Sequence, residues 1–205
     1  MRACFILISC FAGLSLSGCT GGVFAMRGDS ARPAAETRTR DIVISGVITQ
    51  DTADRVLDEL EAQQGSVVTI RLDSPGGDVA AALQIHDRLK HGDRLVVTTV
   101  ADEAQCMSSC TLIFAAGNQR LAGPRSRFRF HAPLYVGRLP LPGPVVGLIE
   151  AMTRRGIANT YAGASPEFAR YLAEPGVLAL HSRKGLALNG KELAALGGNF
   201  VTGML

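Results

Sequence analysis

The sequence predicts an α/β fold in which helices cover a mostly parallel sheet. Short runs of β-branched, apolar residues alternate with stretches of helical periodicity, and no strand pair in the first half is joined by a hairpin turn. Strands of that composition are typical of parallel sheets, whose crossover helices pack on the faces. The 23 glycines and the aromatic share of 5% agree with close backbone packing. With 47% hydrophobic and 19% charged residues, the composition excludes a disordered chain.

The predicted elements begin at Asp41. Apolar residues recur with helical spacing from Ala53 to Leu60, which predicts a helix, and Gly65 ends it as a C-cap. The same alternation of strand and helix continues along the chain. Predicted strands cover residues 42–48, 67–72, 95–100 and 127–131, and predicted helices cover residues 53–60, 78–91, 105–116, 145–162, a segment opened by Ser165 and Pro166, and residues 189–196.

The first 18 residues predict a secretory signal. Arg2 precedes an apolar run over residues 5–16, which is shorter than the ~20 residues that cross a bilayer as a helix. The following Leu16-Ser17-Gly18-Cys19 resembles the bacterial lipobox, in which the signal is cut just before a cysteine that receives diacylglycerol. An ordinary secretory signal with a chance cysteine is the alternative.

Lipid attachment at Cys19 would determine where the chain resides. Buried acyl CH₂ groups, at about 0.8 kcal/mol each, would anchor the mature chain on the periplasmic side of a bacterial membrane. Residues 19–39 are mostly small, charged or turn-forming, and we interpret them as a flexible tether that reaches roughly 25 Å as a random coil. The remaining residues, 40–205, form the predicted folded domain.

Export also simplifies the cysteine pattern. Cys4 and Cys10 leave with the signal and Cys19 becomes the anchor, so that Cys106 and Cys110 remain in an oxidising compartment. Two residues four apart on a helix have Cα atoms about 6 Å apart, a separation that a disulfide tolerates. We therefore expect a Cys106–Cys110 disulfide, with two reduced core thiols as the alternative.

The charge pattern gives no indication of a nucleic-acid partner. The 21 basic residues are interspersed with 18 acidic ones, and the formal net charge is only +3. Proteins that bind nucleic acids usually concentrate Lys and Arg in one patch or stripe. We expect no nucleic-acid partner, no metal ion and no cofactor.

Three segments carry residues suited to chemistry. Ser74-Pro75-Gly76-Gly77 joins a predicted strand to a helix, where glycines let the backbone approach a ligand and the helix N-terminus favours negative charge. A plain turn is the alternative there. Ser108 and Ser109 lie near a predicted helix start, where a serine can be a nucleophile or an N-cap. His131 ends a predicted strand, where it either faces a cleft or is structural.

Together these segments resemble the proteolytic subunit of Clp protease, ClpP, within the wider ClpP/crotonase fold. The resemblance covers about residues 41–134, with a weaker similarity over residues 189–203. A cysteine-flanked serine and a lipobox look like secreted bacterial ClpP-like proteins. The matching motifs are Ser74 to Gly77, Ser108 nine residues before the last residue of Ala115-Ala116-Gly117, Pro124-x-Ser126-Arg127, and His131-x-Pro133.

The resemblance implies a role for each matched residue. Ser108 would be the nucleophile and His131 its general base. The backbone N–H groups of Gly77 and Ser109 would form the oxyanion hole. A peptide or unfolded protein would be the substrate, the lipid anchor would contact the membrane, and a homo-oligomer is compatible with this interpretation.

The acid of a catalytic triad has no match. Counting back from the terminal Leu196-Gly197 places the family's Asp near Gly185, and no Asp follows Asp102 anywhere in the chain. The groups that remain to orient the His131 ring are Glu150, Glu167, Glu174, Ser182 or a backbone carbonyl.

The missing acid leaves three functions open. We expect an extracytoplasmic serine peptidase or related hydrolase that uses a Ser-His pair, and since loss of the acid from a triad can lower turnover about 10⁴-fold, its activity would be weak. A catalytically weak or inactive lipoprotein that binds peptides or proteins is the alternative. An acyl-CoA enzyme of the same fold is a further one, which secretion disfavours because CoA is a cytoplasmic cofactor.

Overall fold

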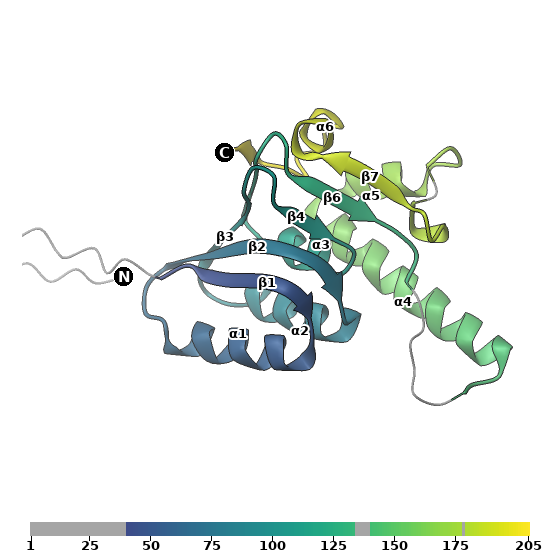
Figure 1. Ribbon diagram of the computed structural model, residues 1–205, viewed down its shortest axis with the longest axis horizontal. Coiled ribbons are helices and arrows are strands. Elements are labelled where there is room, and N and C mark those ends of the chain that lie inside the picture. The colour runs from purple at the N-terminus through teal and green to yellow at the C-terminus, as the bar shows by residue number, and fades with distance from the viewer. Residues whose placement is uncertain (1–39, 134–139, 178) are drawn as a thin grey trace, which may run out of the picture. The chain divides into compact units, whose positions relative to one another are not determined.

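The computed structural model describes residues 40–133, 140–177 and 179–205 (Figure 1). The predicted signal, Cys19 and the predicted tether lie outside the described residues. The helices are α1 (Gln50–Ala62), α2 (Val79–Lys90), α3 (Cys110–Ala115), α4 (Gly143–Ala164), α5 (Pro166–Ala173) and α6 (Gly190–Ala195), with a 3-10 turn at Ala179–His181. The strands are β1 (Ile42–Ile48), β2 (Val67–Gly77), β3 (Leu95–Val100), β4 (Gln105–Met107), β5 (Gln119–Ala122), β6 (Arg127–Phe130), β7 (Leu186–Asn189) and β8 (Gly203–Met204).

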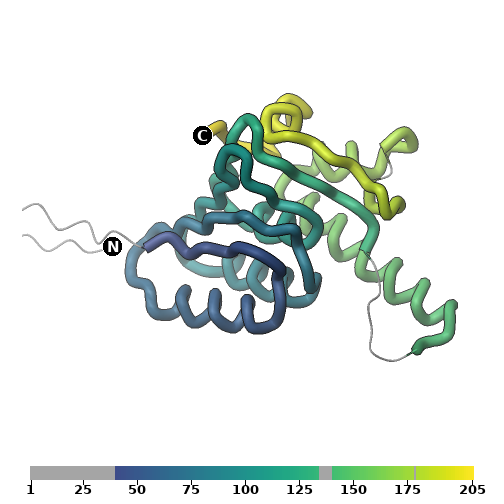
Figure 2. The backbone as a smooth tube through the Cα atoms, in the orientation of Figure 1, coloured from purple at the N-terminus to yellow at the C-terminus, as the bar shows by residue number. Residues whose placement is uncertain are grey.

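The described strands form one mostly parallel sheet, which confirms the predicted fold class. Its order is β7-β6-β4-β2-β3-β5-β8, and β1 pairs with β2 as well. The pair of β6 and β7 is antiparallel, and Figure 2 shows these two strands side by side although they are distant in sequence. Strand β2 connects the two parts of the sheet, because residues 67–71 pair with β3 whereas Ser74 pairs with β4.

The sheet has one buried and one open face. Side chains along β2 alternate between the faces, and Val68, Ile70 and Leu72 join the buried sides of α1 and α2 in a common core. On the opposite face of β1, Val43 and Val47 are exposed. The sequence analysis expected a sheet covered by helices; among the described residues, helices cover this one face.

A cluster of buried rings joins the second half of the domain to the sheet. Tyr161 of α4 and Phe168 of α5 pack with Phe130 of β6 and Phe200, at ring-centroid distances of 4.1 to 6.0 Å. Large buried aromatic rings contribute much of the apolar area in a core. The helix α4 is thereby fixed beside the carboxyl end of β6. No helix within the described ranges is long and apolar enough to cross a membrane.

The predicted helix over residues 105–116 is wrong in its first part. Gln105–Met107 is strand β4, and the helix α3 starts only at Cys110. The interruption lies at Ser108, whose φ of 55° is incompatible with a right-handed helix. Strands β5, β7 and β8 were not predicted, because runs of two to four residues are too short for a periodic pattern.

Candidate active site

Three neighbouring strands bring the predicted residues to one edge of the sheet. The pairing of β4 with β2 and with β6 is parallel, so the carboxyl ends of all three strands lie together. Gly76 and Gly77 end β2, Ser108 follows β4 and His131 follows β6. Ligand sites in parallel sheets lie at such carboxyl ends.

Ser108 occupies a sharp turn between β4 and α3. Its φ of 55° is rare for a residue with a side chain, and such strain costs about 1 to 2 kcal/mol. The Ser108 N–H donates to Arg129 O at 2.8 Å, which continues the pairing of β4 with β6. The Ser108 carbonyl accepts from Thr111 N at 3.0 Å and from Thr111 Oγ1 at 2.6 Å. The turn is thus fixed by hydrogen bonds at both of its backbone groups.

The two cysteines flank this turn. Cys106 lies in β4 and Cys110 begins α3, and both are fully buried. Their Sγ atoms are 2.11 Å apart and their Cα atoms 5.2 Å apart, a disulfide-bonded pair. The sequence analysis placed the pair on one helix, whereas the link joins a strand to a helix across Ser108. The cross-link therefore closes the loop that carries the candidate nucleophile.

The two glycines of β2 allow close backbone approaches, Gly76 to Ser108 and Gly77 to Ile48 of β1. A Cβ on Gly76 would lie 2.7 Å from Ser108 Cβ and 3.2 Å from Ser109 N. A Cβ on Gly77 would lie 2.2 Å from Ile48 O, and both glycines have positive φ. A side chain at Gly76 would push β2 away from the Ser108 turn, and one at Gly77 would push it away from β1. Either residue would also be strained at its positive φ.

The direction of the Gly77 amide follows from its neighbours. Asp78 N–H donates to Ile48 O of β1 at 2.9 Å. Because successive amides of a strand point to opposite sides, the Gly77 N–H is directed away from β1, toward the side of β4 and Ser108. Ser74 Oγ accepts from Gly76 N at 3.0 Å and donates to Gly46 O at 2.6 Å, so it holds this end of β2 against β1.

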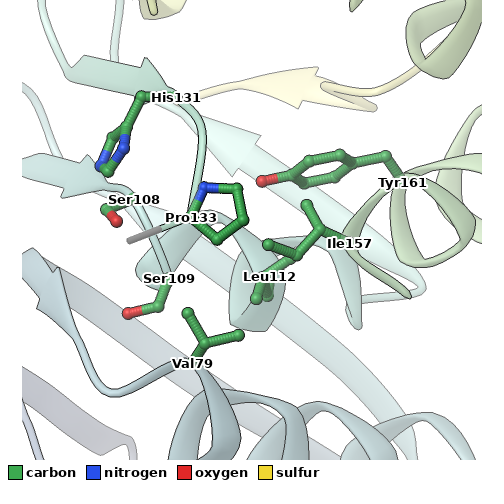
Figure 3. A pocket seen from close by; sticks show the side chains of 8 residues that line it. All are labelled: Val79, Ser108, Ser109, Leu112, His131, Pro133, Ile157 and Tyr161. Atoms are coloured by element: carbon green, nitrogen blue, oxygen red, sulfur yellow. The ribbon is translucent and has the colours of Figure 1, made fainter. Parts of the chain in front are cut away.

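The geometry of His131 determines its tautomer. Nδ1 lies 2.7 Å from Ala132 O, and since a carbonyl oxygen only accepts, Nδ1 carries the hydrogen. In a neutral ring with this tautomer, Nε2 has a free lone pair. Figure 3 shows the ring and the Ser108 side chain facing the same pocket. No hydrogen bond joins Ser108 Oγ to His131 within the described residues, and catalytic hydrogen bonds often tighten only when substrate is bound.

The structure places the unmatched acid position directly beside the histidine. A Cβ on Gly185 would lie 2.0 Å from Phe130 O and 2.6 Å from His131 Cβ. The only hydrogen bond of His131 among the described residues is to Ala132 O, so neither Ser182 nor a glutamate orients the ring in this structure. Ser182 acts on the backbone instead, because its carbonyl accepts from Ala132 N at 3.0 Å.

A small pocket opens at this edge (Figure 3). Its lining residues are Val79, Ser108, Ser109, Leu112, His131, Pro133, Ile157 and Tyr161. The sequence analysis did not predict the contribution of Tyr161 from α4. Burial raises the pKa of Tyr161 above its ordinary value, and the hydrogen bond with Thr111 opposes that shift. Tyr161 is therefore a neutral group in the wall of the pocket.

Thr111 links Tyr161 to the turn. Thr111 Oγ1 lies 2.6 Å from Tyr161 OH, and it uses its own hydrogen on Ser108 O, so the tyrosine hydroxyl is the donor between the two. A hydroxyl three residues after a candidate nucleophile at a helix start is a sequence signal that could have identified Thr111. No comparable sequence signal identifies Tyr161.

Comparisons with known proteins agree with this arrangement. A family model described as Clp protease matches residues 33–140, more than half of the chain. An ATP-dependent Clp protease proteolytic subunit of Ligilactobacillus salivarius is 31% identical over 101 residues, 47% of this chain and 51% of that protein. The corresponding subunit 1 of Protochlamydia amoebophila is 29% identical over 136 residues, 62% and 65% of the two chains.

One solved structure shows the same fold. A ClpP1 mutant from Listeria monocytogenes superposes with a TM-score of 0.67 at 23% sequence identity, covering 82% of this chain and 91% of the other. In sequence, the chain spans about half the length of the first of these relatives. The matched part contains β1 to β6 and with them all three segments of the site.

Proposed function

The chain belongs to the Clp protease family, and from this premise we propose that it is a serine peptidase acting on peptides or unfolded protein segments. Ser108 is the nucleophile and His131 the general base. The observation that carries the proposal is the hydrogen bond from His131 Nδ1 to Ala132 O, because it leaves Nε2 free to take the serine proton.

The proposed reaction has two halves. His131 Nε2 takes the proton from Ser108 Oγ as this oxygen bonds to the substrate carbonyl carbon, and the carbonyl oxygen becomes negative. His131 then gives the proton to the leaving nitrogen as the C–N bond breaks. Water, activated by the same imidazole, releases the acyl group from Ser108 in the second half.

Two backbone amides support the oxyanion. The Ser109 N–H directly follows the nucleophile and, within the described residues, makes no backbone hydrogen bond. The Gly77 N–H is directed to the same side of β2. One such donor is commonly worth about 3 kcal/mol of the barrier. Because a neutral carbonyl stabilises an imidazolium less than a carboxylate does, we expect slower turnover than a complete triad would give.

We also propose an extracytoplasmic location with a lipid on Cys19. The support is the basic and apolar N-terminus, the lipobox and the Cys106–Cys110 pair, which suits an oxidising compartment. The names of the relatives describe ATP-dependent proteases. Since ATP is a cytoplasmic nucleotide, short or unfolded peptides suit a protein outside the inner membrane better than folded proteins.

A fluorophosphonate probe tests the catalytic proposal. Wild-type protein with its disulfide intact should be labelled, and Ser108→Ala and His131→Ala should both abolish labelling. Ser109→Ala should largely keep it, because the backbone N–H of residue 109 survives truncation of the side chain. Absence of labelling in folded wild-type protein would contradict the proposal.

That negative outcome would favour a peptide-binding lipoprotein without turnover. The specific observation in favour of this alternative is that no carboxylate reaches His131 and no hydrogen bond joins it to Ser108 in the described residues. If the unlabelled protein still bound peptides, the peptide-binding site would be retained without turnover. If it bound none, that site would be lost as well.

Membrane fractionation tests the location. Wild-type protein produced in a bacterium should fractionate with membranes and migrate as a lipidated form on a gel. Cys19→Ser should be found in the soluble fraction. Unchanged fractionation and mobility of Cys19→Ser would contradict lipid attachment at this residue.

A further inference from the structure

A groove lies on the open face of the sheet, over the neighbouring strands β4, β6 and β7 (Figure 1). Its volume is about 570 Å³, whereas the pocket at Ser108 has a volume of only about 20 Å³. Ligand sites in proteins commonly enclose about 300 to 1,000 Å³. The groove therefore has room for several side chains of a ligand, and it opens to solvent.

Two arginines lie in the middle of this groove. Side chains alternate along β6, so Phe130 packs in the aromatic cluster while Arg127 and Arg129 lie on the open face. Lys184 adds a third positive charge to the lining. The strand pairing places an uncharged residue on each side of both arginines: Gln105 and Asn189 beside Arg127, and Met107 and Ala187 beside Arg129.

No carboxylate neutralises the two arginines in the described part of the chain. Arg125 forms ion pairs with two neighbouring carboxylates, whereas no ion pair involves Arg127 or Arg129. Glu192, the only carboxylate that lines the groove among the described residues, is used in the cap of α6, where it accepts from Asn189 N at 2.8 Å. The lining thus carries an excess of positive charge.

The guanidinium groups of both arginines donate to backbone carbonyls. Arg127 Nη2 lies 3.4 Å from Glu103 O, a weak hydrogen bond. Arg129 donates through Nε and Nη2 to Lys184 O at 3.2 and 3.0 Å, which fixes its side chain across the groove. Neutral carbonyls leave both positive charges uncompensated, and each guanidinium has further N–H groups for an anion.

The groove starts beside the proposed catalytic pair. Ser108 N–H donates to Arg129 O at 2.8 Å, so the Arg129 side chain begins next to the turn of the proposed nucleophile. Gly185, which lines the groove, packs its backbone against His131. An extended peptide advances about 3.3 Å per residue, so a few residues carry it from Ser108 over Arg129 to Arg127.

We propose that this groove binds an acidic segment of the peptide substrate, in which carboxylates at alternate positions meet Arg127 and Arg129. The proposal rests on the proposed function, because it places the segment beside the bond that Ser108 attacks. Side chains two residues apart on an extended chain share a face and lie about 7 Å apart, the spacing of the two arginines along β6. A Glu-x-Glu segment therefore matches both, whereas adjacent glutamates point to opposite faces.

Peptide binding to Ser108→Ala protein tests the groove without turnover. The matched ligands are two acetylated and amidated peptides of equal composition, one with Glu-x-Glu and one with Glu-Glu-x in an otherwise neutral sequence. The Glu-x-Glu peptide should bind about tenfold more tightly at low salt, because only it makes a second charge-assisted hydrogen bond, and added salt should reduce the difference. Arg127→Gln in this background should abolish the preference, whereas the exposed Arg170→Gln on α5 should retain it.

Cleavage by wild-type protein separates this proposal from the proposed function. The kcat/KM values of the two peptides should differ by the same tenfold. Unlabelled wild-type protein whose Ser108→Ala form still prefers Glu-x-Glu would overturn the peptidase proposal alone. Equal binding of the two peptides, or a preference that survives Arg127→Gln, would overturn the acidic groove.

Two other ligands of the groove are also distinguished. Tighter binding of a neutral peptide with a free C-terminal carboxylate than of the amidated Glu-x-Glu peptide would assign the arginines to a chain terminus and overturn the proposal. Sedimentation of wild type and Arg127→Gln tests for a second copy of the chain. A wild-type oligomer that dissociates in Arg127→Gln would place that copy in the groove and likewise overturn the proposal.

Discussion

The turn that carries Ser108 and the strand end that carries His131 are held by different means. Ser108 has a disulfide around it, hydrogen bonds at both backbone groups and glycine backbone in close contact. His131 has one hydrogen bond from its ring, to the next residue's carbonyl, and the backbone of Gly185 against its Cα and Cβ. The turn of the proposed nucleophile is cross-linked, whereas the proposed base is oriented by local backbone geometry alone.

This difference shows how a serine site can be arranged without a carboxylate. A buried acid near His131 would need its own partners and its own space. Here the space is taken, because the Gly185 backbone lies where a third side chain would start. The Nδ1–H tautomer of His131 is still specified, because a carbonyl oxygen, like a carboxylate, only accepts hydrogen bonds. The arrangement lacks the negative charge of a carboxylate, which would stabilise the protonated His131 ring.

The largest effect is expected from Gly185→Asp, which adds a carboxyl where the triad acid is missing. We expect it to inactivate the protein and to lower the free energy of unfolding by roughly 3 kcal/mol, because its Cβ would meet Phe130 O and its φ of 62° disfavours a side chain. Urea unfolding and probe labelling measure the two effects.

The neighbouring residue gives a matched control for that variant. Lys184 is exposed, and Lys184→Asp adds the same carboxyl one residue earlier without a clash, so its unfolding free energy should change by about 0.5 kcal/mol or less. Faster labelling of folded Gly185→Asp would show that the site accepts an acid there and that the present backbone arrangement is not required.

Removal of the disulfide should have the next largest effect. A link closing so short a loop is worth about 2 kcal/mol on the chain-entropy model, so Cys106→Ala/Cys110→Ala should unfold at lower urea concentration. Labelling of Ser108 should also slow, because the turn loses its cross-link. A reductant should slow labelling of wild type and leave the double variant unchanged.

The same link is testable without substitution. Protein purified from the periplasm should show no free thiol at Cys106 or Cys110 by alkylation under native or denaturing conditions. Two reactive thiols, together with equal stability in the presence and absence of reductant, would contradict the disulfide. The Ser108 turn would then not be held more firmly than His131 by a cross-link.

The Ser108 turn and the strand end that carries His131 also differ in how well the sequence predicts their local structure. The motifs around Ser74–Gly77, Ser108 and His131 predict which residues the fold brings together, because parallel strands end at one edge. The β-branched runs likewise predict β1 to β3. The turn at Ser108 is not predictable from periodicity, since a disulfide and a strained φ override the helical pattern of residues 105–116.

Other features depend on contacts between distant residues. Counting along the sequence identifies Gly185 as the acid position, but only the tertiary structure shows that its backbone leaves no room for one. An unspecified backbone carbonyl was one of several candidates for orienting His131, and only the coordinates identify it as that of Ala132. The groove around Arg127 and Arg129 likewise becomes evident only when the pairing of β6 with β7 is known.

The smallest effect is expected from Tyr161→Phe, which removes the outer support of the Ser108 turn. Its hydroxyl donates to Thr111, which in turn donates to Ser108 O, so the variant should lose about 1 kcal/mol of stability and label more slowly.

The pKa of Tyr161 is raised by burial, so above about pH 10 the unfolded chain loses this proton while the folded chain keeps it. Wild-type stability should therefore fall with rising pH there, by up to about 1.4 kcal/mol per pH unit more than Tyr161→Phe. Urea titrations of both proteins between neutral and strongly alkaline pH measure the difference, and parallel curves would show that Tyr161 is not the buried support of the proposed nucleophile.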